Sequence, residues 1–62
     1  MKLYQGSEIL AGDHVILGGK EYEVQLVHGN MVYVLGKDWP IHASKIDRVL
    51  RYVPEMDDVV TV

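Results

Sequence analysis

The stretch that decides the fold spans residues 14–35 and reads HVILGGKEYEVQLVHGNMVYVL. Its middle segment, residues 20–28, alternates between apolar and polar side chains, with Tyr22 and Val24 on one face and Glu21 on the other. A period of two is typical of a half-buried β-strand. Gly-Gly and Gly-Asn pairs separate this segment from the apolar runs on either side, and such pairs favour tight hairpin turns. We therefore predict an antiparallel meander of three strands.

The segment after the meander is compatible with two structures. Ser44 and Asp47 have the spacing of a helix-capping pair, and a helix over residues 45–52 fits the apolar spacing. The same residues are rich in β-formers and suit a strand equally well. Of the two, we expect one helical turn near residues 43–47, followed by a strand over residues 48–53.

The two ends of the chain are less regular. Residues 1–10 show no sustained period, which predicts either an irregular arm or a short edge strand. Residues 54–62 form an acidic and then apolar tail whose last part reads as an edge strand. We assign residues 1–53 to a single small β-barrel domain and treat the tail separately.

The composition restricts the protein to one small domain without covalent cross-links. The chain has 62 residues, no cysteine and a hydrophobic content of 48%. These values exclude a disulfide framework and a thiolate metal site, and they argue against intrinsic disorder. The apolar runs are too short to cross a membrane, and the first residues lack the apolar stretch of a signal peptide. We expect a cytoplasmic protein with no cofactor and no membrane contact.

The alternation and the turn positions also predict the core. Inward-facing positions of the strands should supply most of it, since alternate residues share one face of a sheet. The expected members are Val15, Leu17, Tyr22, Val24, Leu26, Val32, Val34, Ile41, Ile46, Val49 and Leu50.

Four segments carry a resemblance to a known fold: GDHV at 12–15, GKEYEV at 19–24, GNMVYV at 29–34 and PIHASKI at 40–46. In this order they resemble an SH3-like small β-barrel, over residues 12–53. The resemblance implies an all-β fold, a five-stranded and partly open barrel with one short helical turn before the last strand. Members of this class bind peptides, nucleic acids or other proteins and rarely catalyse reactions. The match is to the fold alone, so it does not transfer a function.

Motifs for catalysis and metal binding are weak. His14, His28 and His42 do not have the close spacing by which one strand or turn aims two ligands at a metal. Ser7 and Ser44 are candidate nucleophiles, but neither has a recognisable base beside it in a catalytic pattern. We expect neither an enzyme nor a metal site.

The features that remain favour binding to another protein. Trp39 next to Pro40 in a loop is a typical hot-spot anchor. Val59, Val60 and Val62 lie in a strand-like segment that suits edge pairing. The leading hypothesis is a non-enzymatic regulatory accessory module that binds another protein through edge-strand pairing or self-association. Small acidic modules of this kind suggest, by analogy, a bacterial or phage protein.

Two alternatives stay open. Lys37, Lys45, Arg48 and Arg51 form the one basic patch of the sequence, and with Tyr52 they would suit RNA or DNA binding. The net charge of −3 opposes this reading, although the acidic excess lies entirely in the tail. The other alternative is a structural subunit of a larger assembly.

Overall fold

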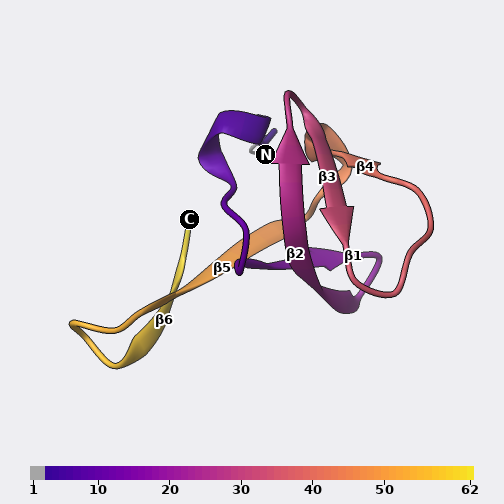
Figure 1. Cartoon of the computed structure of the whole chain (residues 1–62). Helices are drawn as coiled ribbons and strands as arrows, with labels where there is room; N and C mark the ends of the chain where they lie inside the picture. Colours follow the sequence, from indigo (N-terminus) through magenta and orange to yellow (C-terminus); the bar gives the residue numbers. More distant parts are fainter. Residues whose placement is uncertain (1–2) are drawn as a thin grey trace.

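The computed structural model describes residues 3–62, which fold into an antiparallel sheet of six strands in the order β4-β3-β2-β1-β5-β6 (Figure 1). The strands are β1 (His14–Leu17), β2 (Lys20–His28), β3 (Met31–Val34), β4 (Ile41–His42), β5 (Arg48–Val53) and β6 (Asp58–Thr61). In the described chain the only helical elements are two 3₁₀ turns, η1 (Gly6–Glu8) and η2 (Ala43–Lys45). The predicted all-β class is confirmed. The predicted strand number is one too low, because the tail contributes β6.

The predicted hairpin turns are present at both ends of β2. Gly18 and Gly19 have φ values of 58° and 82°, and Gly29 has a φ of 61°. Side chains other than glycine and asparagine rarely adopt this left-handed conformation, so the glycines fix where β2 begins and ends. The meander of β1, β2 and β3 therefore follows from local sequence.

Strand β2 belongs to both halves of the sheet. Its first residues pair with β1 and its last residues with β3, and the register shifts at a bulge between Val24 and Leu26. One extra residue reverses the alternation of side chains. Leu26, predicted to be in the core, is consequently 48% exposed, while Val27 packs against the core.

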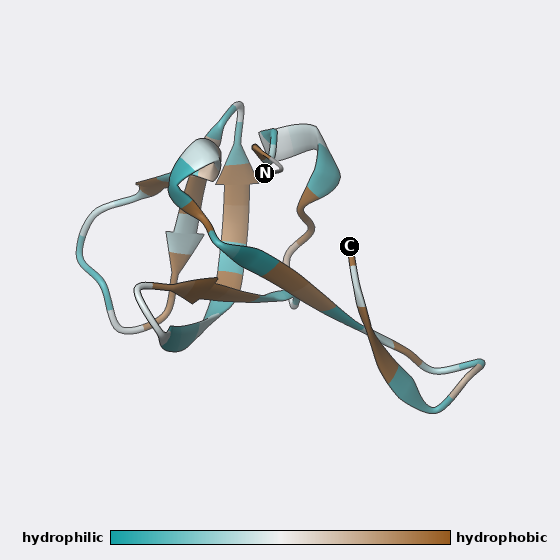
Figure 2. Ribbon diagram, turned by 180° about the vertical axis from the view of Figure 1, so that it is seen from behind, coloured by the Kyte–Doolittle hydropathy of each residue, from teal (hydrophilic) through white to brown (hydrophobic). Residues whose placement is uncertain are grey.

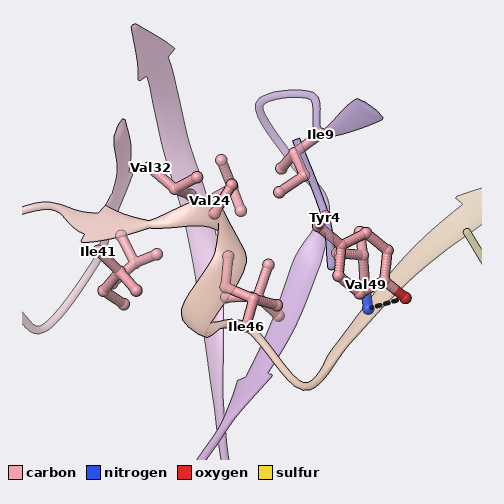
Figure 3. Close-up of a cluster of buried hydrophobic side chains, with 10 residues drawn as sticks. Tyr4, Ile9, Val24, Val32, Ile41, Ile46 and Val49 are labelled. Atoms are coloured by element: carbon pink, nitrogen blue, oxygen red, sulfur yellow. Dashed lines mark hydrogen bonds between the residues drawn. The ribbon is translucent and has the colours of Figure 1, made fainter. Parts of the chain in front are cut away.

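The core lies between the two halves of the sheet (Figure 3). Seven of its ten buried members were predicted from alternation, namely Val15, Val24, Val32, Val34, Ile41, Ile46 and Val49. Leu17 and Tyr22 pack against this cluster as partly buried side chains, and Leu50 is half-buried. Tyr4, Ile9 and Ala43 are buried members that alternation did not predict.

The N-terminal arm is an ordered part of the core. Tyr4 is 5% exposed, and its hydroxyl donates to the Val62 carbonyl (2.9 Å) while accepting from the Val49 N–H (3.3 Å; Figure 3). The Val62 N–H donates to the Val49 carbonyl at 2.9 Å. The Tyr4 hydroxyl therefore bridges the Val49 N–H and the Val62 carbonyl, which would otherwise form the second hydrogen bond of the last β5–β6 pair. This single hydroxyl joins the arm, β5 and the residue that follows β6.

A glycine allows the arm to approach the β2–β3 turn. The Gly6 N–H donates to Asn30 Oδ1 at 2.8 Å, and a Cβ at Gly6 would collide with the Gly29 carbonyl oxygen. This close backbone approach explains why a glycine stands in η1.

An ion pair between the buried Asp13 and the partly buried Arg51 fixes the arm to β5. Asp13 is 3% exposed and accepts from Arg51 through Nε (2.9 Å) and Nη2 (2.7 Å), and from the Leu10 N–H (2.9 Å). Arg51 Nη2 also donates to the Glu8 carbonyl at 3.0 Å. The hydrogen bond to Asp13 raises the pKa of Arg51 above its ordinary value. Such a two-point pair is among the stronger polar interactions in proteins.

The segment between β4 and β5 corrects one local prediction. His42, and not Ser44, is the N-cap of η2, because its ring Nδ1 accepts from the Ser44 N–H at 3.2 Å. The predicted helical turn is present but spans residues 43–45, and residues 48–53 form strand β5, which excludes the alternative helix. Among the described residues no helix is both long and apolar enough to span a membrane.

Candidate functional site

The β5–β6 hairpin projects from the body of the sheet (Figures 1 and 2). Its turn is closed by the Met56 N–H donating to the Val53 carbonyl (3.1 Å) and the Asp57 N–H donating to the Pro54 carbonyl (3.2 Å). Asp57 adopts a left-handed φ of 49°, and its carboxylate accepts from the Tyr52 hydroxyl at 2.7 Å. This hydrogen bond raises the pKa of the Tyr52 phenol, since it favours the protonated form. Tyr52 is thereby held beside the turn of the hairpin.

The strand register places apolar side chains together on the outer face of the sheet. Tyr52 lies opposite Val59 in the β5–β6 ladder, and Leu50 lies opposite His14 in the β1–β5 ladder. Tyr52 is 55% exposed and Val59 is 53% exposed. They border a depression of about 330 Å³, called the outer groove here, whose lining residues are Gly12, His14, Glu21, Leu50, Tyr52 and Val59.

One wall of the outer groove is acidic. His14 Nδ1 lies 2.6 Å from Glu21 Oε2, and His14 Nε2 lies 4.0 Å from Glu23 Oε1. The Glu21 and Glu23 side chains are each about half exposed. Within residues 3–62 no group of three histidine, cysteine or acidic residues has a geometry that would hold a metal ion. Because both carboxylates are about half exposed, the wall can offer them to a ligand, although one oxygen of Glu21 is already bonded to His14.

The free edge of β6 is partly blocked. Along an antiparallel ladder every second residue of a strand bonds to the neighbouring strand. Val62 bonds to Val49 of β5, so the backbone N–H and C=O groups of Val59 and Thr61 point away from β5. The outward Val59 N–H donates to Asp58 Oδ1 at 2.8 Å. This bond occupies one of the four outward backbone groups of β6, and a charge at the edge discourages strand addition.

The structure separates the residues predicted to bind a partner. Val59 lines the outer groove, whereas Val60 is half-buried and Val62 packs against the core. Trp39 is 66% exposed and lies with Pro40 in the loop between β3 and β4. That loop and the hairpin lie on opposite sides of the molecule in both views (Figures 1 and 2). The predicted residues thus form two separate surfaces.

The predicted basic patch is also divided. Lys37 Nζ lies 5.4 Å from the ring centre of Tyr22 and 6.0 Å from that of Trp39. Lys45 is exposed in η2, and Arg48 is exposed at the start of β5. The remaining two members have intramolecular partners, since Arg51 pairs with Asp13 and Tyr52 with Asp57.

A second depression lies between the arm and β2. It has a volume of about 620 Å³, and its lining includes Leu10 and Leu26. Leu10 is 55% exposed and Leu26 is 48% exposed, and none of the lining residues within 3–62 is charged. Ser7 is the one polar side chain among them, so the depression offers mainly apolar contact and no charged group to orient a ligand.

Sequence reasoning missed four residues of the outer groove, which are Gly12, His14, Glu21 and Leu50. The alternation in β2 does place Glu21 on a solvent-facing side. However, the pairing of β1 with β5 joins residues more than thirty positions apart, and no local signal specifies it. Val59 of the tail and Glu21 of β2 could therefore not be recognised from sequence as parts of one site.

Comparisons with protein-family models, with curated proteins and with solved structures found no match for this chain.

Proposed function

We propose that the protein is a non-enzymatic interaction module of the SH3-like barrel type that binds an extended segment of another protein in the outer groove. The strand order β4-β3-β2-β1-β5, with a 3₁₀ turn directly before β5, supports the SH3-like assignment. Strand β6 would then be an addition that enlarges the outer face. The observation that carries the proposal is the groove itself, with two half-exposed apolar side chains beside carboxylates.

The groove suits a peptide better than a compact ligand. It crosses the face from β6 to β2, since Val59 and Glu21 both line it. The Glu21 carboxylate lies 2.6 Å from the His14 ring on β1. His14 is two strand spacings (about 10 Å) from β6 and level with Thr61, two residues (about 7 Å) from Val59, so the diagonal is about 12 Å, or about four residues of extended chain. Apolar side chains of such a segment would cover Tyr52 and Val59. We place the ligand on this face and not along the edge of β6, because Asp58 blocks part of that edge.

The test is an unbiased selection of random peptides on the whole chain, followed by titration of the peptides obtained. Val59→Glu should weaken them at least about tenfold, equivalent to about 1.4 kcal/mol, because apolar contact is lost and a carboxylate is desolvated. Leu26→Glu is the matched control, since Leu26 is similarly exposed but lies outside the outer groove. It should leave the affinity unchanged, and circular dichroism should show both variants folded.

Three results would contradict the proposal. The first is a selection that gives no peptide whose binding depends on Val59. The second is binding that is lost in Trp39→Ala and retained in Val59→Glu, which would transfer the site to the β3–β4 loop. If the chain instead retains RNA or DNA with an affinity that falls steeply as salt increases, nucleic acid is the ligand and the peptide proposal is wrong.

A further inference from the structure

We infer that the segment bound in the outer groove carries a lysine or arginine within three residues of an apolar anchor. This inference rests on the proposed function and names the class of ligand that the groove selects. It follows from how charges and apolar groups are distributed along the groove.

The two ends of the outer groove differ in chemistry. At the β6 end, Val59 and Tyr52 present half-exposed apolar surface. At the β2 end, Glu21 lines the groove, and Glu23 lies beside it through its approach to His14. A ligand that spans the groove therefore meets apolar side chains at one end and, about 12 Å away, carboxylates at the other.

Charge around the groove favours a cationic ligand. Glu21 and Glu23 face outward from β2, and Asp57 is held next to Tyr52 at the other end. Within the described strands Arg48 is the one lysine or arginine on this face, and it lies two residues before Leu50. His14 also lies on this face and contacts Glu21 through Nδ1, so a cationic ligand would meet Glu23 and the outward part of the Glu21 carboxylate. Arg51 does not contribute, because Asp13 neutralises it on the inner side of the sheet.

The spacing sets the position of the cation. An extended chain advances about 3.3 Å per residue, so a residue over Val59 and one over the Glu21 carboxylate, about 12 Å away, are separated by about three to four positions. A lysine or arginine side chain is long enough to reach the carboxylates from one position nearer. The expected ligand thus has an apolar residue and a basic residue two or three positions apart, in either chain direction.

A second copy of this chain is a poorer occupant. The protein has a net charge of −3, and its tail carries the acidic excess next to the apolar residues that would enter the groove. Like charges on the two faces would oppose such a contact. Self-association is therefore an outcome that the experiment distinguishes.

The experiment uses the peptides obtained by the unbiased selection and the full chain. Their sequences should contain the basic and apolar pair, and Glu21→Gln with Glu23→Gln should weaken them by about three- to tenfold. Asp38→Asn removes one charge from the β3–β4 loop and should have no effect. The affinity of the wild-type chain should also fall between low and high salt, since exposed charge pairs are screened.

The outcomes separate the inference from the function. Peptides that depend on Val59 but lack a basic residue, and that bind equally well to the double glutamine variant, would overturn the inference and leave the proposed function intact. A selection with no Val59-dependent peptide would overturn both. A mass that increases with concentration in sedimentation and is abolished by Val59→Glu would show that a second copy occupies the groove, and the inference would be wrong.

Discussion

Replacement of Tyr4 by phenylalanine tests how the arm is joined to the sheet. The ring of Tyr4 is buried, so Tyr4→Phe retains the apolar contacts and removes only the hydroxyl. That hydroxyl accepts from the Val49 N–H (3.3 Å) and donates to the Val62 carbonyl (2.9 Å). Val49 is 0% exposed, so its N–H would lose its partner without gaining water.

The expected loss of stability is about 2–4 kcal/mol. An unsatisfied buried donor costs about 1–3 kcal/mol, and the lost bond to the half-buried Val62 carbonyl adds about 1 kcal/mol. A chain of this length has a free energy of unfolding of about 3–9 kcal/mol, so the change is a large fraction of the total. The midpoint of thermal unfolding should fall by about 10–25 °C.

Urea unfolding followed by far-ultraviolet circular dichroism measures this change. Trp39 emission is a poor probe, because its side chain is 66% exposed in the folded state. Tyr33→Phe is the matched control, since it removes the same atom from a ring on the outer face, and it should change stability by less than about 0.5 kcal/mol. A Tyr4→Phe loss as small as that of the control would refute the bridging role of the hydroxyl.

Three further changes test other contacts. Asp13→Asn should lower the free energy of unfolding by about 1–3 kcal/mol in urea titrations, because it breaks the ion pair with the partly buried Arg51. An unchanged free energy of unfolding would contradict a stabilising role of this ion pair. Gly6→Ala should destabilise by more than about 2 kcal/mol in the same assay, since its Cβ would meet the turn backbone, and a neutral effect would exclude the close approach. Asp57→Asn should lower the pKa of Tyr52 towards its ordinary value in a titration at 295 nm. In the wild-type chain the bond to Asp57 raises the pKa of Tyr52, so the bond stabilises the fold below about pH 10. This stabilisation is lost as the pH rises through the pKa that Tyr52 has in the folded state. Equal titration curves for the wild-type chain and Asp57→Asn would contradict the bond.

The local parts of the fold were predictable from sequence, and the non-local parts were not. Glycine pairs and a period of two determine the meander, because both act within a few residues. The bulge after Val24 overrides that period, so Leu26 was assigned to the wrong face. Tyr4 and Asp13 were missed as structural residues, since their partners in β5 are 45 and 38 positions away.

The candidate site was predictable only in pieces. Val59 and Tyr52 were singled out for different functions, and the pairing of β5 with β6 brings them together. The basic patch looked continuous in sequence because Arg48 and Arg51 are close along the chain. Side chains three positions apart in a strand point to opposite faces, so Arg48 faces outward and Arg51 reaches Asp13.

We propose that the outer groove binds an extended peptide that carries a basic and an apolar residue. The most direct measurement is a map of backbone amide chemical shifts of the ¹⁵N-labelled chain during titration with a peptide from the selection. The largest changes are predicted at the groove residues Gly12, His14, Glu21, Leu50, Tyr52 and Val59. Changes centred on residues 36–40 around Trp39, or on the arm around Leu10, would contradict it.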